Sequence, residues 1–255
     1  MFSVIVCSID PVKFAQIQAH YQQLFGTEPS ELIGIHDARS LAEGYNRGIA
    51  HAKGEFIIFS HDDIEFLRPI DWLIRLKTHL SRFDMVGLAG TTRLAYPMWV
   101  QSGPPYIFGQ VAHTSGTKDW PAPYRLEIYG APAGAIYGIQ AMDGLFLAMR
   151  RDVLARVKFD EKTFDGFHCY DLDFTFCAYQ AGFKLAVICD MPALHNSTGD
   201  FSSDTWRQTA QLFTRKHGQH FPPLSNRKFV VTQVSAQSKE ELLEIMSPPY
   251  IWPAK

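Results

Sequence analysis

The sequence predicts an α/β fold with a mostly parallel central sheet flanked by helices. Short apolar segments alternate with segments of helical spacing over residues 2–89, and strands that alternate with helices pair as parallel sheets. One segment, residues 55–59, is almost continuously apolar, which is typical of a strand buried on both faces. Ligands of such sheets bind beyond the carboxyl ends of the strands, so the residues that follow each strand are the first candidates for a site.

The first three elements follow from local patterns. Residues 2–8 and 31–36 are short apolar runs, and we expect each to form a strand. Residues 13–25 carry apolar side chains that recur on one face of a helix. The chain therefore begins with the order strand, helix, strand.

A second helix is predicted from its capping residues. Ser40 can cap its start, with Glu43 in the reciprocal position. The helix is expected to run to about Lys53, where Gly54 is placed to end it. The buried strand 55–59 then follows.

The later chain is a mixture of regular elements and one irregular segment. From Thr91 to Gly138 the residues are rich in Pro, Gly and aromatics, and we expect an ordered insertion with short strands that flanks a site. The other expected elements are helix 69–83, strand 85–89, strand 144–149, helix 151–157, helix 171–181 closed by Gly182, strand 183–189 and helix 203–217. We expect one domain over residues 1–220, with the insertion at about 91–140, and a C-terminal extension over 221–255.

Composition limits the class of protein. The 255 residues are 46% hydrophobic and carry a net charge of -2, so the chain can bury a large core and has no basic excess for nucleic acid. No signal peptide or membrane-spanning run is expected, while peripheral contact with the inner face of the membrane stays open. The cysteines show neither a metal-site spacing nor a dense disulfide framework, which fits the reducing cytoplasm. They are Cys7, Cys169, Cys177 and Cys189.

Two adjacent carboxylates, Asp62 and Asp63, come directly after the third strand. At the end of a buried strand they repel each other unless a cation or hydrogen bonds offset the charge. A hard divalent cation held by one or two carboxylates and completed by phosphates is the usual magnesium arrangement. A turn in which one carboxylate caps the next segment explains the pair equally well.

Two later groups of residues also have both a structural and a functional interpretation. Asp171 and Asp173 lie at the start of helix 171–181, where one can cap the helix while the other faces a cleft as a general base. Spacing alone favours a helix-capping role. His195 follows strand 183–189; a lone histidine is more often structural, yet beside a carboxylate pair it is a candidate third metal ligand.

Several short motifs occur in a specific order along the chain. They are the runs at residues 40–49 (SLAEGYNRGI), 52–59 (AKGEFIIF), 61–63 (HDD), 142–144 (MDG), 150–154 (RRDVL), 159–161 (FDE), 170–173 (YDLD) and 181–183 (AGF). In this order they resemble the family 2 inverting glycosyltransferases, over roughly residues 2–200. The resemblance implies the GT-A fold and the transfer of a sugar from a nucleotide diphosphate to an acceptor hydroxyl.

The resemblance also implies site residues. Asp63 and His195 would hold a divalent cation, Mn²⁺ or Mg²⁺, and Asp171 would be the catalytic base. The candidates for contacts to the donor or its nucleotide are Asp10, Asp37, Asn46, His61, Asp62 and Asp143. Two positions depart from the pattern, because His61 replaces the first aspartate of the family's Asp-x-Asp motif and Tyr170 replaces the glutamate before the base.

The resemblance implies two partners, a nucleotide-diphosphate sugar and a carbohydrate, lipid-linked or small-molecule acceptor. No nucleic-acid partner is expected. Aromatic rings offer flat faces for an acceptor, although each single ring is favoured as core. The candidate rings are Trp99, Tyr106, Phe108 and Trp120. The alternative function is a non-catalytic sugar-nucleotide or carbohydrate-binding protein on the same fold. A nucleotidyltransferase or a dinucleotide-dependent oxidoreductase is disfavoured, because no Gly-rich loop follows the first strand.

Overall fold

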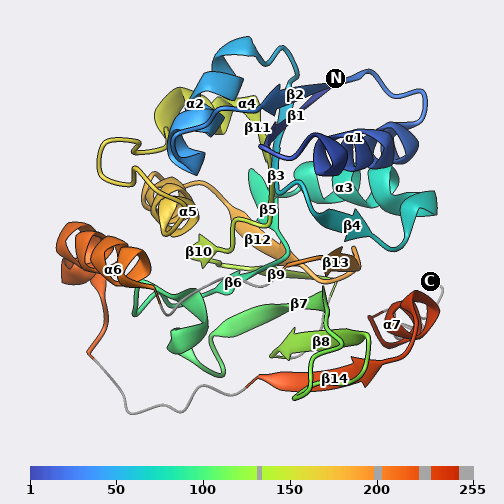
Figure 1. Ribbon diagram of the computed structural model, residues 1–255. Coiled ribbons are helices and arrows are strands. Elements are labelled where there is room, and N and C mark those ends of the chain that lie inside the picture. The colour runs from blue at the N-terminus through green and yellow to red at the C-terminus, as the bar shows by residue number, and fades with distance from the viewer. Residues whose placement is uncertain (131–133, 198–202, 224–230, 247–255) are drawn as a thin grey trace, which may run out of the picture.

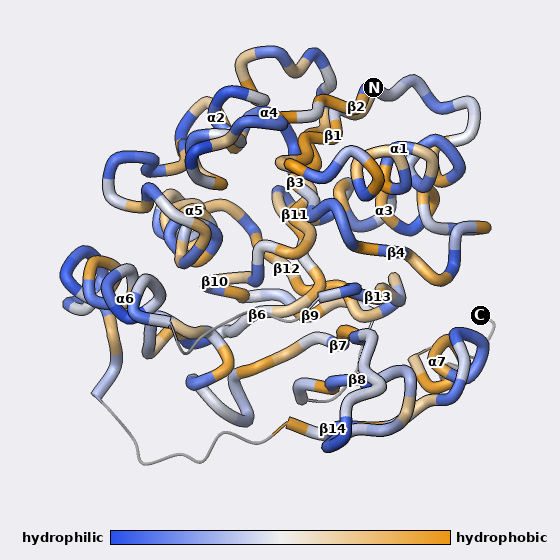
Figure 2. Tube along the Cα trace, in the orientation of Figure 1, coloured by the Kyte–Doolittle hydropathy of each residue, from blue (hydrophilic) through white to orange (hydrophobic). Residues whose placement is uncertain are grey.

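The computed structural model describes residues 1–130, 134–197, 203–223 and 231–246 (Figure 1). Its centre is a seven-stranded sheet. In spatial order the strands are β2 (Ser30–Ile35), β1 (Phe2–Cys7), β3 (Phe56–Ser60), β11 (Phe146–Arg150), β5 (Met85–Gly87), β12 (Leu185–Ile188) and β9 (Ala135–Tyr137). The hydropathy colouring of Figure 2 shows apolar residues along the strands at the middle of this sheet, where the core lies.

The predicted α/β class with a mostly parallel sheet is confirmed. Strands β1, β2, β3, β5 and β12 run in one direction, while β11 and β9 run against their neighbours. Strand β11 is antiparallel to both of its neighbours, β3 and β5, and follows a short turn from β10 (Ala141–Met142), a strand of the second sheet. That turn therefore lies at the carboxyl end of β3, where Phe146 pairs with Ser60.

Helices cover both faces of the sheet. Figure 1 shows α1 and α3 on one side and α2, α4 and α5 on the other. The helices are α1 (Pro11–Phe25), α2 (Leu41–His51), α3 (Trp72–Leu80), α4 (Arg151–Arg156), α5 (Tyr170–Gln180), α6 (Asp204–His217) and α7 (Lys239–Met246), with short 3₁₀ turns at Pro69–Asp71, Trp99–Ser102 and Gly218–His220. Stacked rings fill the core, such as Phe159 and Phe174, whose centroids are 4.1 Å apart.

A second, mostly short-stranded sheet lies below the first in Figure 1 and carries the segment that was expected to be an insertion. Its strands are β10, β6 (Ala89–Thr91), β7 (Ile107–Thr114), β13 (Ala193–His195) and β4 (Ile64–Phe66), extended by β8 (Tyr124–Tyr129) and β14 (Thr232–Ala236). Strand β14 pairs with β8, and α7 packs beside it, so the described part of the C-terminal extension contacts the insertion. Residues 224–230 and 247–255 of that extension lie outside the described residues.

The start of α2 follows the predicted capping pattern with one difference. The Ser40 hydroxyl accepts a hydrogen bond from the Glu43 backbone N–H, as expected. The Glu43 carboxylate accepts from the backbone N–H of Arg39 instead of that of Ser40. The helix ends at His51, and Gly54 has another role, because a Cβ there would lie 2.5 Å from the backbone nitrogen of Ser3.

No helix in the described part of the chain combines the length and the apolar character that a membrane span requires.

Candidate active site

A cavity of about 590 Å³ opens between the two sheets. The ends of β3 and β13, the turn between β10 and β11, the residues before α5 and the strands β7 and β8 all contribute to its wall. The candidates His61, Asp143, Asp171 and His195 line it. The cavity therefore joins candidates that are up to 134 positions apart in the sequence, from His61 to His195.

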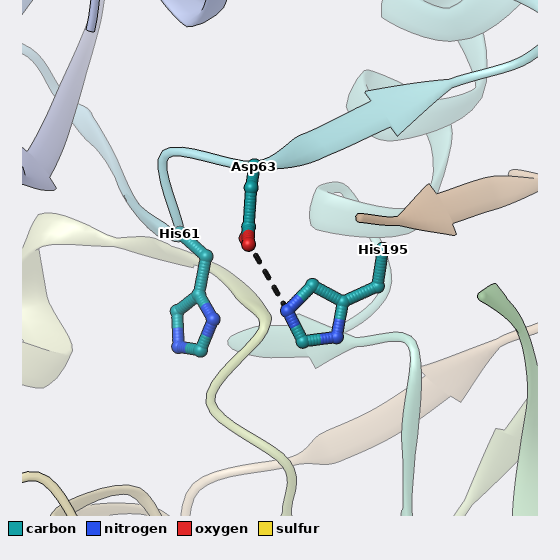
Figure 3. A group of neighbouring side chains, drawn as sticks. All are labelled: His61, Asp63 and His195. Carbon is teal, nitrogen blue, oxygen red and sulfur yellow. Dashed lines mark ion pairs between the residues drawn. The ribbon is translucent and has the colours of Figure 1, made fainter. Parts of the chain in front are cut away.

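His61, Asp63 and His195 form a cluster whose candidate ligand atoms all lie within 4.8 Å of one another (Figure 3). The Nε2 atom of His195 is 3.3 Å from Oδ1 of Asp63. Pairing of β4 with β13 produces this contact, since His195 lies opposite Ile64, the residue after Asp63. The Asp63 carbonyl also accepts a hydrogen bond of 2.9 Å from the backbone N–H of Asn196.

The charges of this cluster are suited to a cation. Burial acts to raise the pKa of Asp63, but the hydrogen bond and charge of His195 outweigh it, so the pKa lies well below its usual value and the carboxylate is ionised. Burial and the neighbouring His195 lower the pKa of His61. A neutral imidazole and an ionised carboxylate are the forms that bind metals. The ammonium of Lys13 lies 3.6 Å from the other oxygen of Asp63.

Asp62 points away from this cluster. Its carboxylate accepts a hydrogen bond of 2.6 Å from the Ser8 hydroxyl at the end of β1. Asp10, also beyond β1, caps α1 by accepting from the backbone N–H groups of Val12 and Lys13. These two carboxylates lie at the carboxyl edge of the sheet, outside the residues that line the cavity.

Asp37 and Asn46 also lie outside the cavity lining. Asp37 is exposed after β2 and forms an ion pair of 2.7 Å with Arg47. The Asn46 amide donates to the Phe159 carbonyl and to the Glu161 carboxylate, so it joins α2 to the loop after α4. Their contacts are with other parts of the protein.

Asp171 and Asp173 have different surroundings although they are two residues apart. Asp173 is buried between α5 and α6, where one oxygen is 2.7 Å from Nε2 of His217 and 2.8 Å from the Lys216 ammonium. Asp173, Cys177 and His217 also form a group of potential metal ligands. The Lys216 ammonium already balances the Asp173 charge, so we interpret this group as the junction of the two helices.

Asp171 instead faces the turn before β11. Its Oδ2 accepts a hydrogen bond of 2.8 Å from the Gly144 backbone N–H. Burial and the nearby Asp143 carboxylate raise the pKa of Asp171 to about 7. A Cβ at position 144 would overlap the Tyr170 hydroxyl and Asp171, so this close approach requires glycine.

Asp143 is held at the cavity wall by two donors. Its Oδ1 accepts from the Leu145 backbone N–H at 3.0 Å, and its Oδ2 accepts from the Trp99 indole N–H at 3.1 Å. Trp99 is the one predicted platform ring among the residues that line this cavity. Phe108 packs against the core, Tyr106 lies under the Arg93 guanidinium, and the Trp120 indole donates to the Tyr124 carbonyl.

Sequence reasoning missed the residues on β7 and β8 that face the cavity. His113 comes from β7, and Arg125, Glu127 and Tyr129 come from β8. Their polar groups interact, since the Tyr129 hydroxyl donates to Glu127 at 2.5 Å and the Arg125 guanidinium lies 3.3 Å from the same carboxylate. The spacing of two along residues 125–129 places these side chains on one face of a strand, and this alternation was the available signal.

The sequence matches the model of a family described as "Glycosyltransferase like family" over residues 3–217. No curated protein matches it. Among solved structures, the chain is similar to the mannosyltransferase PcManGT from Pyrobaculum calidifontis in complex with GDP-Man and Mn²⁺ (TM-score 0.50, 13% identity, 86% of this chain and 63% of that chain covered). It is also similar to GalNAc-T7 with UDP, GalNAc and Mn²⁺ (TM-score 0.51, 11% identity, 88% and 52% covered).

The chain spans less than two thirds of the length of both of these proteins. At such low identities the likeness concerns the fold, which is the GT-A fold expected from the motifs.

Proposed function

Because the chain belongs to this glycosyltransferase-like family, we propose that it transfers a sugar from a nucleotide diphosphate to an acceptor hydroxyl, with inversion at the anomeric carbon and with a divalent cation. The observation that carries the proposal is the cavity whose wall contains His61 and His195, which cluster with Asp63, together with the partly buried carboxylate of Asp171. The structures of PcManGT and GalNAc-T7, which contain nucleotide or nucleotide sugar and Mn²⁺, support it.

The donor side of the proposed reaction uses the ends of β3 and β13. Asp63 and His195 would hold the cation, Mn²⁺ or Mg²⁺. The ionised carboxylate of Asp63 and the imidazole of His195 are both suitable metal ligands. A cation bound there would stabilise the negative charge that develops on the departing diphosphate. Lys13, next to Asp63, is placed to contact a phosphate oxygen, and Asp143 is placed to accept hydrogen bonds from the sugar.

The nucleotide would lie along the carboxyl ends of β1 and β2, where we propose contacts from Asp10, Asp37 and Asp62. Asn46 would act indirectly, because its amide holds the loop beyond α4.

Asp171 would be the base. As the acceptor oxygen bonds to the anomeric carbon, the bond from that carbon to the diphosphate breaks, and Asp171 takes the hydroxyl proton. Its carboxylate accepts a hydrogen bond from the Gly144 N–H, which fixes one oxygen, and the residue lines the cavity. Attack from the side opposite the leaving group gives inversion.

The acceptor would occupy the part of the cavity bounded by β7 and β8. Trp99 offers an aromatic surface, while Arg125 and Glu127 offer polar groups for a carbohydrate, lipid-linked or small-molecule acceptor.

We propose residues 1–220 as the catalytic domain and 221–255 as an extension that supports the wall formed by β7 and β8 through β14. We also propose action in the cytoplasm, where the four free thiols stay reduced, with the inner face of the membrane as one location.

Thermal unfolding with nucleotides tests the donor site. Nucleoside diphosphates and their sugars, each with and without Mn²⁺ or Mg²⁺, are added to the purified chain. A matching nucleotide with its cation should raise the unfolding temperature by about 5–10 °C at about 100 times its Kd, since a ligand of the folded state stabilises it. The absence of a shift with every nucleotide would overturn the proposal, and a shift without turnover of any acceptor would favour the non-catalytic alternative.

The pH dependence of transfer should report on Asp171. Only the ionised carboxylate accepts a proton, and its pKa is raised to about 7 by burial and by Asp143. We expect log kcat/KM to rise by about one per pH unit below about pH 7 and to level off above it. In Asp143→Asn the removal of a like charge should move the midpoint to lower pH, and a flat profile between about pH 5 and 9 would contradict the assignment.

A further inference from the structure

Two residues that depart from the glycosyltransferase motif contact each other. His61 stands in place of the first aspartate of the Asp-x-Asp motif, and Tyr170 stands in place of the glutamate before Asp171. Although 109 positions separate them, Nε2 of His61 lies 3.2 Å from the Tyr170 hydroxyl. The Tyr170 side chain is buried, so this partner of the imidazole is fixed in place. The two replacements therefore form one local arrangement.

This contact determines which nitrogen of His61 faces the cluster. Figure 3 shows one ring nitrogen of His61 on the side of Asp63 and His195 and the other pointing away. The nitrogen next to the side-chain attachment, Nδ1, is the one on the Asp63 side, while Nε2 contacts Tyr170. With its proton on Nε2, the ring donates to Tyr170 and presents the lone pair of Nδ1 toward Asp63.

A histidine ligand held in this way has the usual second partner of a metal-bound imidazole. Such rings donate their other N–H to a fixed acceptor, which sets the tautomer and the orientation of the ring. His195 already presents Nε2 to Asp63, at 3.3 Å. Three ligand atoms from the end of β3 and from β13 thus converge, and two of them are imidazole nitrogens.

We propose that His61 is a third metal ligand through Nδ1, positioned by Tyr170, and that the site binds transition metals such as Mn²⁺ and Co²⁺ in preference to Mg²⁺. Mg²⁺ prefers oxygen ligands in near-ideal octahedral geometry and is usually held by carboxylates. Imidazole nitrogen binds divalent first-row transition metals, with an affinity that rises from Mn²⁺ to Co²⁺. The cluster supplies one carboxylate, whose other oxygen is next to the Lys13 ammonium. This inference rests on the proposed function, because it assigns a ligand set to the same cation.

The test measures metal binding directly, without nucleotide or acceptor. Free Mn²⁺ is titrated by electron paramagnetic resonance, Mg²⁺ is used as a competitor, and Co²⁺ is followed by its visible absorption. The intact chain should bind Mn²⁺ at least about tenfold more tightly than Mg²⁺. His61→Ala should weaken Mn²⁺ binding by about tenfold or more and change the Co²⁺ spectrum.

Three further variants separate ligation from folding. Tyr170→Phe keeps the ring and removes the hydroxyl, and we expect it to weaken Mn²⁺ binding by about 10–100-fold and to shift the Co²⁺ absorption. His61→Asp should change the preference toward Mg²⁺, since it replaces an imidazole with an oxygen ligand. His51→Ala removes an exposed histidine from the end of α2 and should leave Mn²⁺ binding unchanged.

The outcomes distinguish this inference from the proposed function. If Asp63→Asn and His195→Ala abolish Mn²⁺ binding while His61→Ala and Tyr170→Phe bind normally, the inference is wrong and the proposed donor site stands. Equal affinity of the intact chain for Mn²⁺ and Mg²⁺ would also overturn it. The proposed donor site itself fails if nucleotides give no stabilisation in the thermal experiment.

Discussion

Replacing Asp171 with asparagine is expected to lower the rate of sugar transfer by about 10²–10⁴-fold, the usual contribution of a general base. The amide has almost the same shape and can still accept a hydrogen bond from the Gly144 N–H, so the fold should be kept. Because the like charge near Asp143 is removed, the variant should be at least as stable as the parent. Steady-state kinetics with a matching donor and acceptor, together with thermal unfolding, measure both effects.

The matched control for this variant is Asp165→Asn. Asp165 is an exposed carboxylate in the loop before α5, so its replacement changes the same charge close in sequence without altering the cavity lining. We expect its transfer rate to equal that of the parent. Full activity in a folded Asp171→Asn variant would show that the proton is taken by another group.

Replacing Asp63 with asparagine should remove metal-dependent donor binding and lower transfer by about 100-fold or more, because several kcal/mol of charge stabilisation depend on the cation. Asp63 is the single carboxylate in the cluster with His61 and His195, so a neutral amide leaves that cluster without a negative charge. The nucleotide-dependent rise in unfolding temperature, measured with and without Mn²⁺, is the direct readout.

Asp152→Asn is a suitable control for the Asp63 variant. Asp152 is exposed on α4, forms an ion pair with Arg150 and is not among the residues that line the cavity. It should keep both the Mn²⁺-dependent shift and the transfer rate. If Asp63→Asn retained the Mn²⁺-dependent shift of the parent, the cation would have to bind elsewhere.

The order of the short motifs along the sequence predicted much of the candidate site. These motifs indicated Asp63, His195, Asp171 and Asp143, and the structure brings all four to one region beside or around the cavity. Spacing alone favoured a capping role for the pair at 171 and 173. The distinction between Asp171 and Asp173 depended on the position of α6, because its residues His217 and Lys216 contact Asp173.

The sequence by itself determined the α/β class and the order of the main helices and strands. Those signals are local: an apolar run such as residues 56–59, or a cap such as Ser40, depends on neighbours a few positions away. The short strands β4 and β13 had no such signal, since three residues carry too little periodicity. Strand β14 and helix α7 likewise lie in the segment that was expected only to be a C-terminal extension.

Only the tertiary structure decided which residues meet. The pairing of β4 with β13 brings His195 to Asp63, and the reversed strand β11 places the Gly144 N–H against Asp171. The contact of His61 with Tyr170 joins two replacements that looked independent in the sequence. Such contacts between residues 27 or more positions apart leave no periodic trace along the chain, because they arise when the sheet brings distant strand ends to one edge.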